Sequence, residues 1–188
     1  MRMDAPDLTN HFLIAMPSLA DPNFSRTVTY LCEHTAEGAL GIVINRPTDI
    51  RLGELLAHLK LPSPPEEVAR RPVFLGGPVQ RDRGFVLHRP LGRWESSLKI
   101  ADDIALTTSK DILAAIARAE GPQDYLIALG YAGWGPGQLE AEMAENAWLS
   151  GPASADVIFG ESSADRWRAA AALLGVDLAL LAPTAGRA

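Results

Sequence analysis

The sequence is short of several things, and each shortage narrows what the protein can be. Cys32 is the only cysteine, so no disulfide can form within the chain. Aromatic residues make up 6% of its 188 residues, so aliphatic and alanine side chains must fill most of the core. No stretch approaches the roughly 18 apolar residues of a membrane span, and the apolar run Phe12–Met16 stops at Pro17, too early for an export signal. These absences predict a soluble, cytoplasmic protein.

Positive charge is also scarce. The chain carries 17 lysines and arginines against 23 aspartates and glutamates, which makes the formal net charge -6. Such a chain has no general attraction to polyanions. The sequence also lacks a basic helix and a basic groove lined with stacking aromatic residues, the features by which nucleic-acid binding is recognised. Direct binding to DNA by this chain is therefore disfavoured.

The hydrophobic patterns predict a mixed α+β protein. Short runs rich in Val, Ile and Thr, bounded by turn residues, predict strands at 11–16, 26–33, 40–45, 73–75, 85–88, 97–100, 125–129, 147–149 and 157–159. A leucine repeat at 52–59, a capping box opening at Thr108, the segment 138–145 and an apolar stripe at 167–174 predict four helices. Gly175 is expected to end the last one. Strands and helices alternate irregularly, which argues against repeated βαβ units.

The segment Gly130–Gly137 contains four glycines and is predicted to be a loop between a strand and a helix. Backbone N–H groups in such a loop can hold an anion. The segment has neither a dinucleotide-binding fingerprint nor a P-loop ending, and Glu140 already complements the dipole of the following helix. A tight structural turn beneath Trp134 is the alternative that we favour.

Catalytic and metal-binding patterns are few. Cys32 and His34 are two residues apart in a predicted strand, so both side chains can lie on one face, but a nucleophilic pair needs a direct hydrogen bond. The apolar neighbours of Cys32 favour a buried, structural thiol. The four histidines are scattered. His88 lies within a basic stretch that contains Arg81, Arg83, Arg89 and Arg93 and that begins with a predicted charged turn at 81–84. We interpret this stretch as solvated, with binding of a small anionic ligand or an acidic partner as the alternative. We therefore expect no catalytic residue, no metal site and no cofactor.

Several ordered motifs resemble the YqgE/AlgH family of bacterial proteins. They begin with Ile14-Ala15-Met16-Pro17-Ser18-Leu19 and continue through the segments 30–34, 41–47, 76–79, 83–88, 107–111, 129–134, 137–140 and 146–149. The resemblance covers residues 11–175, nearly the whole chain. It implies one domain spanning residues 1–188, α+β in class, with mainly antiparallel strands in a pseudo-barrel-like arrangement and helices around it.

The resemblance implies no established reaction, although some family members are labelled transcriptional regulators. We interpret the chain as a non-catalytic regulatory or binding protein that recognises a small ligand or a protein partner. Two alternatives stay open. One is an enzyme that uses a pocket formed by the motif loops, and the other, less favoured, is a regulator that binds DNA directly.

The motif loops also suggest where a ligand would bind. Three predicted strand ends run into loops that contain glycine or proline, and loops on a sheet scaffold commonly carry function. We predict that these loops form one concave site, with Arg46 and Gln138 making polar contacts and Trp134 forming an apolar wall. The predicted ligand-binding residues are Asn45, Arg46, Gly76, Gly77, Gly133, Trp134 and Gln138.

Overall fold

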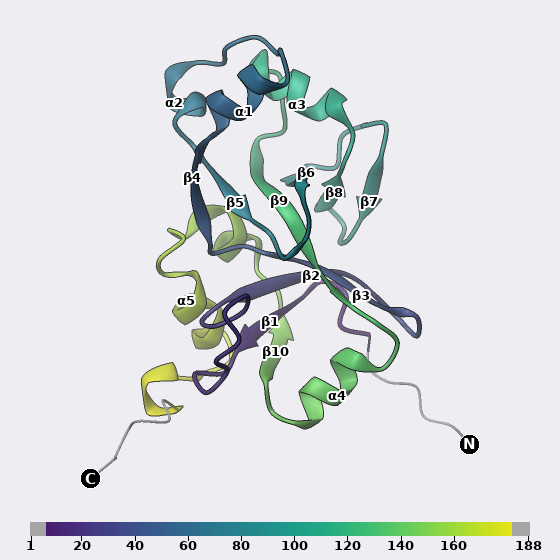
Figure 1. The fold of residues 1–188 in the computed structure, drawn as a ribbon, viewed down its shortest axis with the longest axis vertical. Coiled ribbons are helices and arrows are strands. Elements are labelled where there is room, and N and C mark those ends of the chain that lie inside the picture. Colours follow the sequence, from purple (N-terminus) through teal and green to yellow (C-terminus); the bar gives the residue numbers. More distant parts are fainter. Residues whose placement is uncertain (1–6, 182–188) are drawn as a thin grey trace. The chain divides into compact units, whose positions relative to one another are not determined.

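The computed structural model describes residues 7–181 and divides the chain into two compact units. Unit 1 contains the chain up to Asn45 and again from Ala132 onward, and unit 2 is Arg46–Tyr131. The long strand β9 (Asp124–Trp134) contributes its first part to unit 2 and its last three residues to unit 1. Figure 1 labels the elements along the chain.

Unit 1 is built on an antiparallel sheet. Its strand order is β10 (Trp148–Pro152), β1 (His11–Ala15), β2 (Val28–Thr35), β3 (Gly38–Val43) and the end of β9. Leu13 pairs with Thr29, and Gly41 pairs with Ala132. Strand β1 lies between β10 and β2 in the sheet. It is buried along almost its whole length, and its residues are apolar except for His11.

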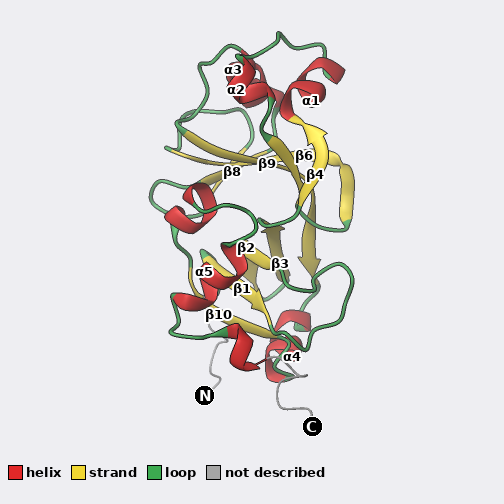
Figure 2. Cartoon of the chain, turned by 90° about the vertical axis from the view of Figure 1, so that its left-hand side faces the viewer, coloured by secondary structure: helices red, strands yellow, loops and turns green. Residues whose placement is uncertain are grey.

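The described residues of unit 1 also form four helical segments: α4 (Gln138–Ala144), the π-helix η1 (Asp156–Gly160), α5 (Arg166–Ala172) and the 3-10 helix η2 (Leu178–Leu181). Figure 2 shows α5 beside the strands of its own unit, and its residues contact β1 and β2. Gly175 has a φ of 72°, the left-handed conformation expected where α5 ends. The strand predicted at 157–159 is wrong, because a short apolar run has no period that separates a strand from one buried helical turn.

Unit 2 contains a second, mainly antiparallel set of strands. Their order is β7 (Ser97–Lys99), β8 (Ala105–Thr107), β6 (Val79–Arg89), β9, β5 (Pro72–Leu75) and β4 (Pro47–Arg51). Only the pairing of β5 with β9 is parallel in the strands described. Helices α1 (Leu52–His58), α2 (Glu66–Ala69) and α3 (Lys110–Ala117) complete the unit. The leucine stripe at 52–59 therefore predicted α1 correctly.

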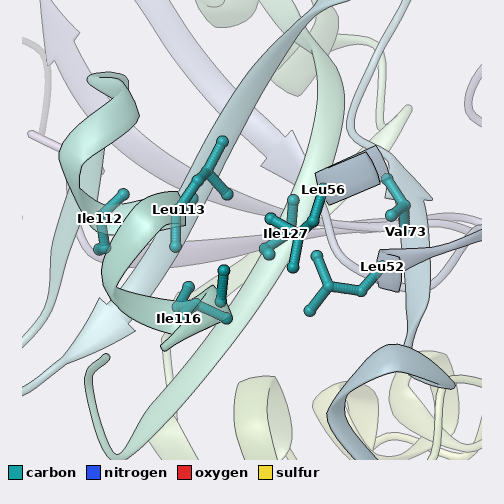
Figure 3. Packing of buried hydrophobic residues seen from close by; sticks show 9 residues of the cluster. Leu52, Leu56, Val73, Ile112, Leu113, Ile116 and Ile127 are labelled. Atoms are coloured by element: carbon teal, nitrogen blue, oxygen red, sulfur yellow. The ribbon is translucent and has the colours of Figure 1, made fainter. Parts of the chain in front are cut away.

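The core of unit 2 joins α1 and α3 to the sheet. Leu52 and Leu56 of α1 meet Ile112 and Ile116 of α3 in one buried cluster with Ile127 of β9 (Figure 3). Burying a side chain of this size contributes about 1.5–3 kcal/mol relative to leaving it exposed. Unit 1 has its own cluster, which combines aliphatic residues with two tryptophans: Leu13, Ala15, Leu31, Ala132, Trp134, Leu139 and Trp148.

Two predicted loops are in fact strands. Residues 81–84, expected to form a charged turn, lie inside β6, and residues 130–134 continue β9 instead of opening a loop. Gly130 makes the continuation possible: its φ is 79°, and a Cβ atom there would lie 2.4 Å from the carbonyl oxygen of Gly77. A glycine-rich segment can thus mark close backbone approach within a sheet as well as a loop.

The predicted α+β class with mainly antiparallel strands is confirmed. The helix start predicted at Thr108 is displaced by one residue, because α3 begins after Ser109. The Ser109 side chain makes no capping hydrogen bond to the helix backbone, and its hydroxyl donates instead to the Asp111 carboxylate. No helix within residues 7–181 is both long enough and apolar enough to cross a membrane.

Candidate functional site

Unit 1 has a hollow of about 630 Å³ beside α5. We call it the Arg26 groove. The connection between β1 and β2 contributes Pro17 and Arg26, α5 contributes Trp167, Arg168 and Ala172, and residues 176–179 form the remaining wall. Its lining therefore combines two arginines with apolar side chains. The volume of the groove falls within the range typical of small-molecule sites.

The two arginines and Trp167 decide the chemistry of the groove. The guanidinium carbon of Arg26 lies 5.6 Å from the centroid of the half-buried Trp167 ring, a cation–π contact. The indole N–H of Trp167 donates to the carbonyl of Ala15 at 2.9 Å, so the ring cannot turn freely. Arg168 is exposed at the same hollow, and Asp177 is the acidic residue in the lining. The lining carries one more positive than negative charge, although the whole chain is acidic.

Asn45 holds Arg26 in place. The Asn45 side-chain amide donates to the carbonyl oxygen of Arg26 at 2.9 Å, and its side-chain oxygen accepts the backbone N–H of Val28, also at 2.9 Å. Arg26 has a φ of 58°, which is rare for a residue with a long side chain. The two hydrogen bonds from Asn45 hold the chain on both sides of Thr27. Asn45, a predicted ligand-binding residue, thus acts on the groove by positioning Arg26.

A buried arginine anchors the other wall of the groove. Arg166, in the first turn of α5, is 7% exposed and donates to the carbonyl oxygens of Ile44 and Val157. Burial lowers the pKa of its guanidinium to about 10, with the opposing charge of Glu161 acting in the other direction. Ile44 therefore holds α5 through Arg166, and Asn45 holds the backbone at Arg26. Because both residues directly follow β3, both walls of the groove are attached at the end of this strand.

Two more predicted residues of unit 1 meet at Glu142 of α4. One Glu142 carboxylate oxygen accepts the indole N–H of Trp134 at 3.1 Å and that of Trp148 at 2.9 Å, and the other accepts the Gln138 amide at 3.1 Å. Trp134 is 6% exposed and also packs against Phe24. Gly133 lies in β9 and pairs with Leu40. These contacts fasten α4 to the sheet and leave little of Trp134 on the surface.

The remaining predicted residues belong to unit 2. The Arg46 carbonyl accepts the backbone N–H of Leu75 at 2.8 Å, and the next N–H, of Gly76, donates to Leu129 at 2.8 Å. Arg46 and Gly76 are thus brought near each other at the ends of β4 and β5. Gly77 follows with its carbonyl directed at Gly130. The common site predicted for all seven residues stays a prediction.

His34 and Cys32 do not form a nucleophilic pair. The Nδ1 atom of His34 accepts the backbone N–H of Leu8 at 3.0 Å, and Nε2 lies 2.9 Å from a Glu140 carboxylate oxygen. With Nδ1 accepting, Nε2 carries the proton and donates it to Glu140. This hydrogen bond is the main reason that the pKa of Glu140 is lowered. Both imidazole nitrogens have partners other than the thiol, and His34 links β2 to α4.

The predicted burial of Cys32 is confirmed: the residue is 1% exposed, and burial raises the pKa of its thiol. We expect iodoacetamide near neutral pH to leave Cys32 unlabelled in the folded protein and to label it after denaturation in urea, as measured by intact mass. Cys32→Ser should lower the free energy of unfolding by about 1 kcal/mol, because a more polar hydroxyl replaces a buried thiol whose one acceptor, the Tyr30 carbonyl, lies 3.5 Å from the sulfur. Rapid labelling of the folded protein would restore a nucleophilic or redox role.

Within residues 7–181, no group of three or more His, Cys, Asp and Glu side chains is arranged to hold a metal ion.

The end of the segment 130–137 is a tight turn: the Gln138 N–H donates to the carbonyl of Gly135, while the Gly135 N–H donates to the Gln138 side chain. The latter N–H group is thus already used within the turn. These hydrogen bonds fit the tight structural turn that we favoured for this segment over a loop that holds an anion.

The fold and the motifs together define a bacterial α+β family. The AlgH-like family model matches residues 12–179, and so spans both units. The chain is 59% identical over 179 residues to a UPF0301 protein of Nitrosococcus oceani, covering 95% of this chain and 96% of that protein. A UPF0301 protein of Thioalkalivibrio sulfidiphilus is 58% identical over 182 residues, with 97% of each chain covered. The chain therefore belongs to the AlgH-like family.

Solved structures agree with this assignment. The solution structure of the AlgH protein from Pseudomonas aeruginosa matches with a TM-score of 0.80 at 50% identity and covers 100% of both chains. A crystal structure of a Corynebacterium diphtheriae protein matches with a TM-score of 0.75 at 20% identity, covering 97% of this chain and 94% of that one. The second likeness concerns the fold alone.

Sequence reasoning missed the residues that line the Arg26 groove. Trp167 is expected only as part of an amphipathic helix, and Arg26 only as the first residue of a strand. No local pattern marks either one as a binding residue. The one available signal was Asn45, whose side chain the structure connects to Arg26.

Proposed function

We propose that this protein is a cytoplasmic binding protein that holds a small amphipathic anion, with a carboxylate or phosphate group and a flat apolar body, in the Arg26 groove. The observation that carries the proposal is the cation–π contact between Arg26 and Trp167 at a hollow that Arg168 also lines. An anion there would receive charge-assisted hydrogen bonds from the guanidinium groups. Trp167, Val176 and Leu178 supply apolar surface for the rest of the ligand.

The size and shape of the groove favour a small molecule over a protein partner. A standard protein interface buries about 800 Å² on each partner and is largely flat, whereas a hollow of about 630 Å³ accommodates a ligand of metabolite size. The acidic chain as a whole repels anions, so the two arginines give the groove its local preference. The same acidity supports a regulator that acts through a ligand over one that binds DNA directly.

A pair of fluorescent probes tests the requirement for a negative charge. Dansyl-glycine carries a carboxylate, and dansyl-glycinamide is its uncharged counterpart. We expect the wild-type protein to bind dansyl-glycine saturably and at least about tenfold more tightly than the amide, since one charge-assisted contact is worth on the order of 1.5 kcal/mol. Titration followed by dansyl fluorescence measures both affinities.

The variants assign the binding to the groove. Arg168→Ala and Arg26→Asn should each weaken dansyl-glycine binding about tenfold and leave dansyl-glycinamide binding unchanged; asparagine is chosen at 26 because it tolerates a positive φ. Arg118→Ala, which removes an exposed arginine of unit 2, is the matched control and should bind like the wild type. Equal affinities for the two probes, or no saturable binding below about 1 mM (a free energy near -4 kcal/mol), would contradict the proposal.

A further inference from the structure

Unit 2 contains a chain of three hydrogen-bonded side chains that the groove does not use. His88 of β6 is fully buried, and its Nε2 atom lies 2.7 Å from the Thr107 hydroxyl of β8. The Thr107 hydroxyl lies 2.6 Å from the hydroxyl of Ser97 in β7. Because β6, β8 and β7 are neighbours in that order and β7 ends the strand order, the chain runs from a buried imidazole to an exposed serine.

The donor and the acceptor of each hydrogen bond among these three side chains follow from one backbone carbonyl. The Nδ1 atom of His88 lies 3.0 Å from the carbonyl oxygen of Pro90, which can only accept, so Nδ1 carries a proton. Burial lowers the pKa of His88, which keeps the ring neutral near pH 7 and leaves Nε2 without a proton. Thr107 must therefore donate to His88, and Ser97 must donate to Thr107.

We propose that Ser97 is a nucleophile activated through Thr107 by His88, and that this part of unit 2 accepts acyl groups from activated esters or thioesters. Nucleophilic serines are activated by an adjacent base that is itself oriented by a third group. Here Thr107 stands between serine and base, and the Pro90 carbonyl orients the imidazole. The motifs that end at His88 and begin at Thr107 thereby acquire a common role.

The Ser97 oxygen forms a bond to the acyl carbon while the bond between that carbon and the leaving oxygen or sulfur breaks. The proton of Ser97 passes to the Thr107 oxygen, and the proton of Thr107 passes to Nε2 of His88, over the 2.6 Å and 2.7 Å contacts. The imidazolium then returns its proton to the Thr107 oxygen, and the Thr107 hydroxyl gives its own proton to the leaving group, because the acylated Ser97 oxygen no longer passes protons on. Water then releases the acid from Ser97 in the reverse sequence of proton transfers.

The substrate class follows from the group that orients His88. A neutral carbonyl stabilises the imidazolium less than the carboxylate of a Ser-His-Asp triad does. Substrates with good leaving groups, such as phenyl esters and thioesters, are therefore expected to react, and amides are not. Lys99, two residues along β7, lies on the same face as Ser97 and brings a positive charge to it. That charge favours acyl groups that carry a carboxylate elsewhere.

Acetylation by p-nitrophenyl acetate tests the proposal. We expect one acetyl group on the wild-type protein by intact mass, located on Ser97 by peptide mapping, with release of p-nitrophenolate at a matching rate. Ser97→Ala should lose the modification and reduce the rate at least tenfold. Ser96→Ala removes the neighbouring exposed serine and should behave as the wild type. Acetylation of Lys99 instead of Ser97, or an unchanged rate in Ser97→Ala, would overturn the proposal.

Thr107 transfers protons between Ser97 and His88 in this proposal, and a pair of variants separates that role from a structural one. Thr107→Ser keeps the hydroxyl and should keep the acetylation rate within a few-fold, whereas Thr107→Val keeps the shape and should lower the rate at least tenfold. Circular dichroism and urea unfolding show whether each variant is folded. The wild-type rate should fall in acid as His88 takes up a proton and Thr107→Val should lose that dependence. Equal rates and equal pH profiles in the two variants would show that the three side chains serve only the fold.

Discussion

Replacing Arg166 by alanine should lower the free energy of unfolding by about 3 kcal/mol or more. The substitution leaves the buried carbonyls of Ile44 and Val157 without the donors they have in the native structure, and each such group costs about 1–3 kcal/mol. It also opens a cavity at the start of α5. Burial lowers the pKa of Arg166 because the guanidinium is removed from water. Truncation to alanine keeps the buried carbonyls and removes the donors that satisfy them.

Urea unfolding followed by circular dichroism measures this loss. Arg168→Ala is the matched control, because it lies two residues further along α5 and is exposed, and it should change the stability by no more than about 0.5 kcal/mol. Arg166→Lys keeps the charge but not the planar fork that reaches two carbonyls, so its loss should be intermediate. An Arg166→Ala protein as stable as the control would show that α5 is held by its apolar face alone.

The second large effect is expected at Gly130. Gly130→Ala should cost about 3 kcal/mol or more, because the residue has a φ of 79° and its Cβ would lie 2.4 Å from the Gly77 carbonyl oxygen and 3.1 Å from that of Val79. The left-handed conformation alone costs an L-residue roughly 1–2 kcal/mol. The contact with two backbone groups adds a further 1–3 kcal/mol, typical of overpacking.

Gly137 offers a control for the conformational part of that cost. Its φ of 74° is close to that of Gly130, but no heavy atom lies within 4 Å of where a Cβ would be. Gly137→Ala should therefore cost only the roughly 1–2 kcal/mol of the left-handed conformation. Thermal and urea unfolding of both variants give the comparison. Equal losses would mean that the backbone around Gly130 moves aside without cost.

Patterns with a regular period were the reliable part of the sequence. The leucines at 52–59 form α1, and the stripe that begins at Trp167 forms α5 with Gly175 left-handed after it. In both cases a stretch of at least seven residues repeats at the helical period. The run 157–159 has only three residues, too few to show a period, and it forms part of a π-helix instead of a strand.

Glycine was the least informative signal. The cluster from Gly130 onward predicted a loop, yet Gly130 and Gly133 lie within β9. A glycine can mean a turn or a place where two backbones come close, and the two alternatives differ only in what the rest of the chain does nearby. Gly77, whose carbonyl approaches Gly130, lies more than fifty residues earlier in the sequence.

By itself, the sequence determined the family, the α+β class, the major helices and the burial of Cys32, because these depend on ordered motifs, on periodicity and on the character of neighbouring residues. Only the tertiary structure decided which side chains meet. The groove joins Arg26 to Trp167, and the relay joins His88 to Ser97 through Thr107. Strand pairing and helix packing set these contacts between residues far apart in the chain, and no local pattern of residue types records such a distance.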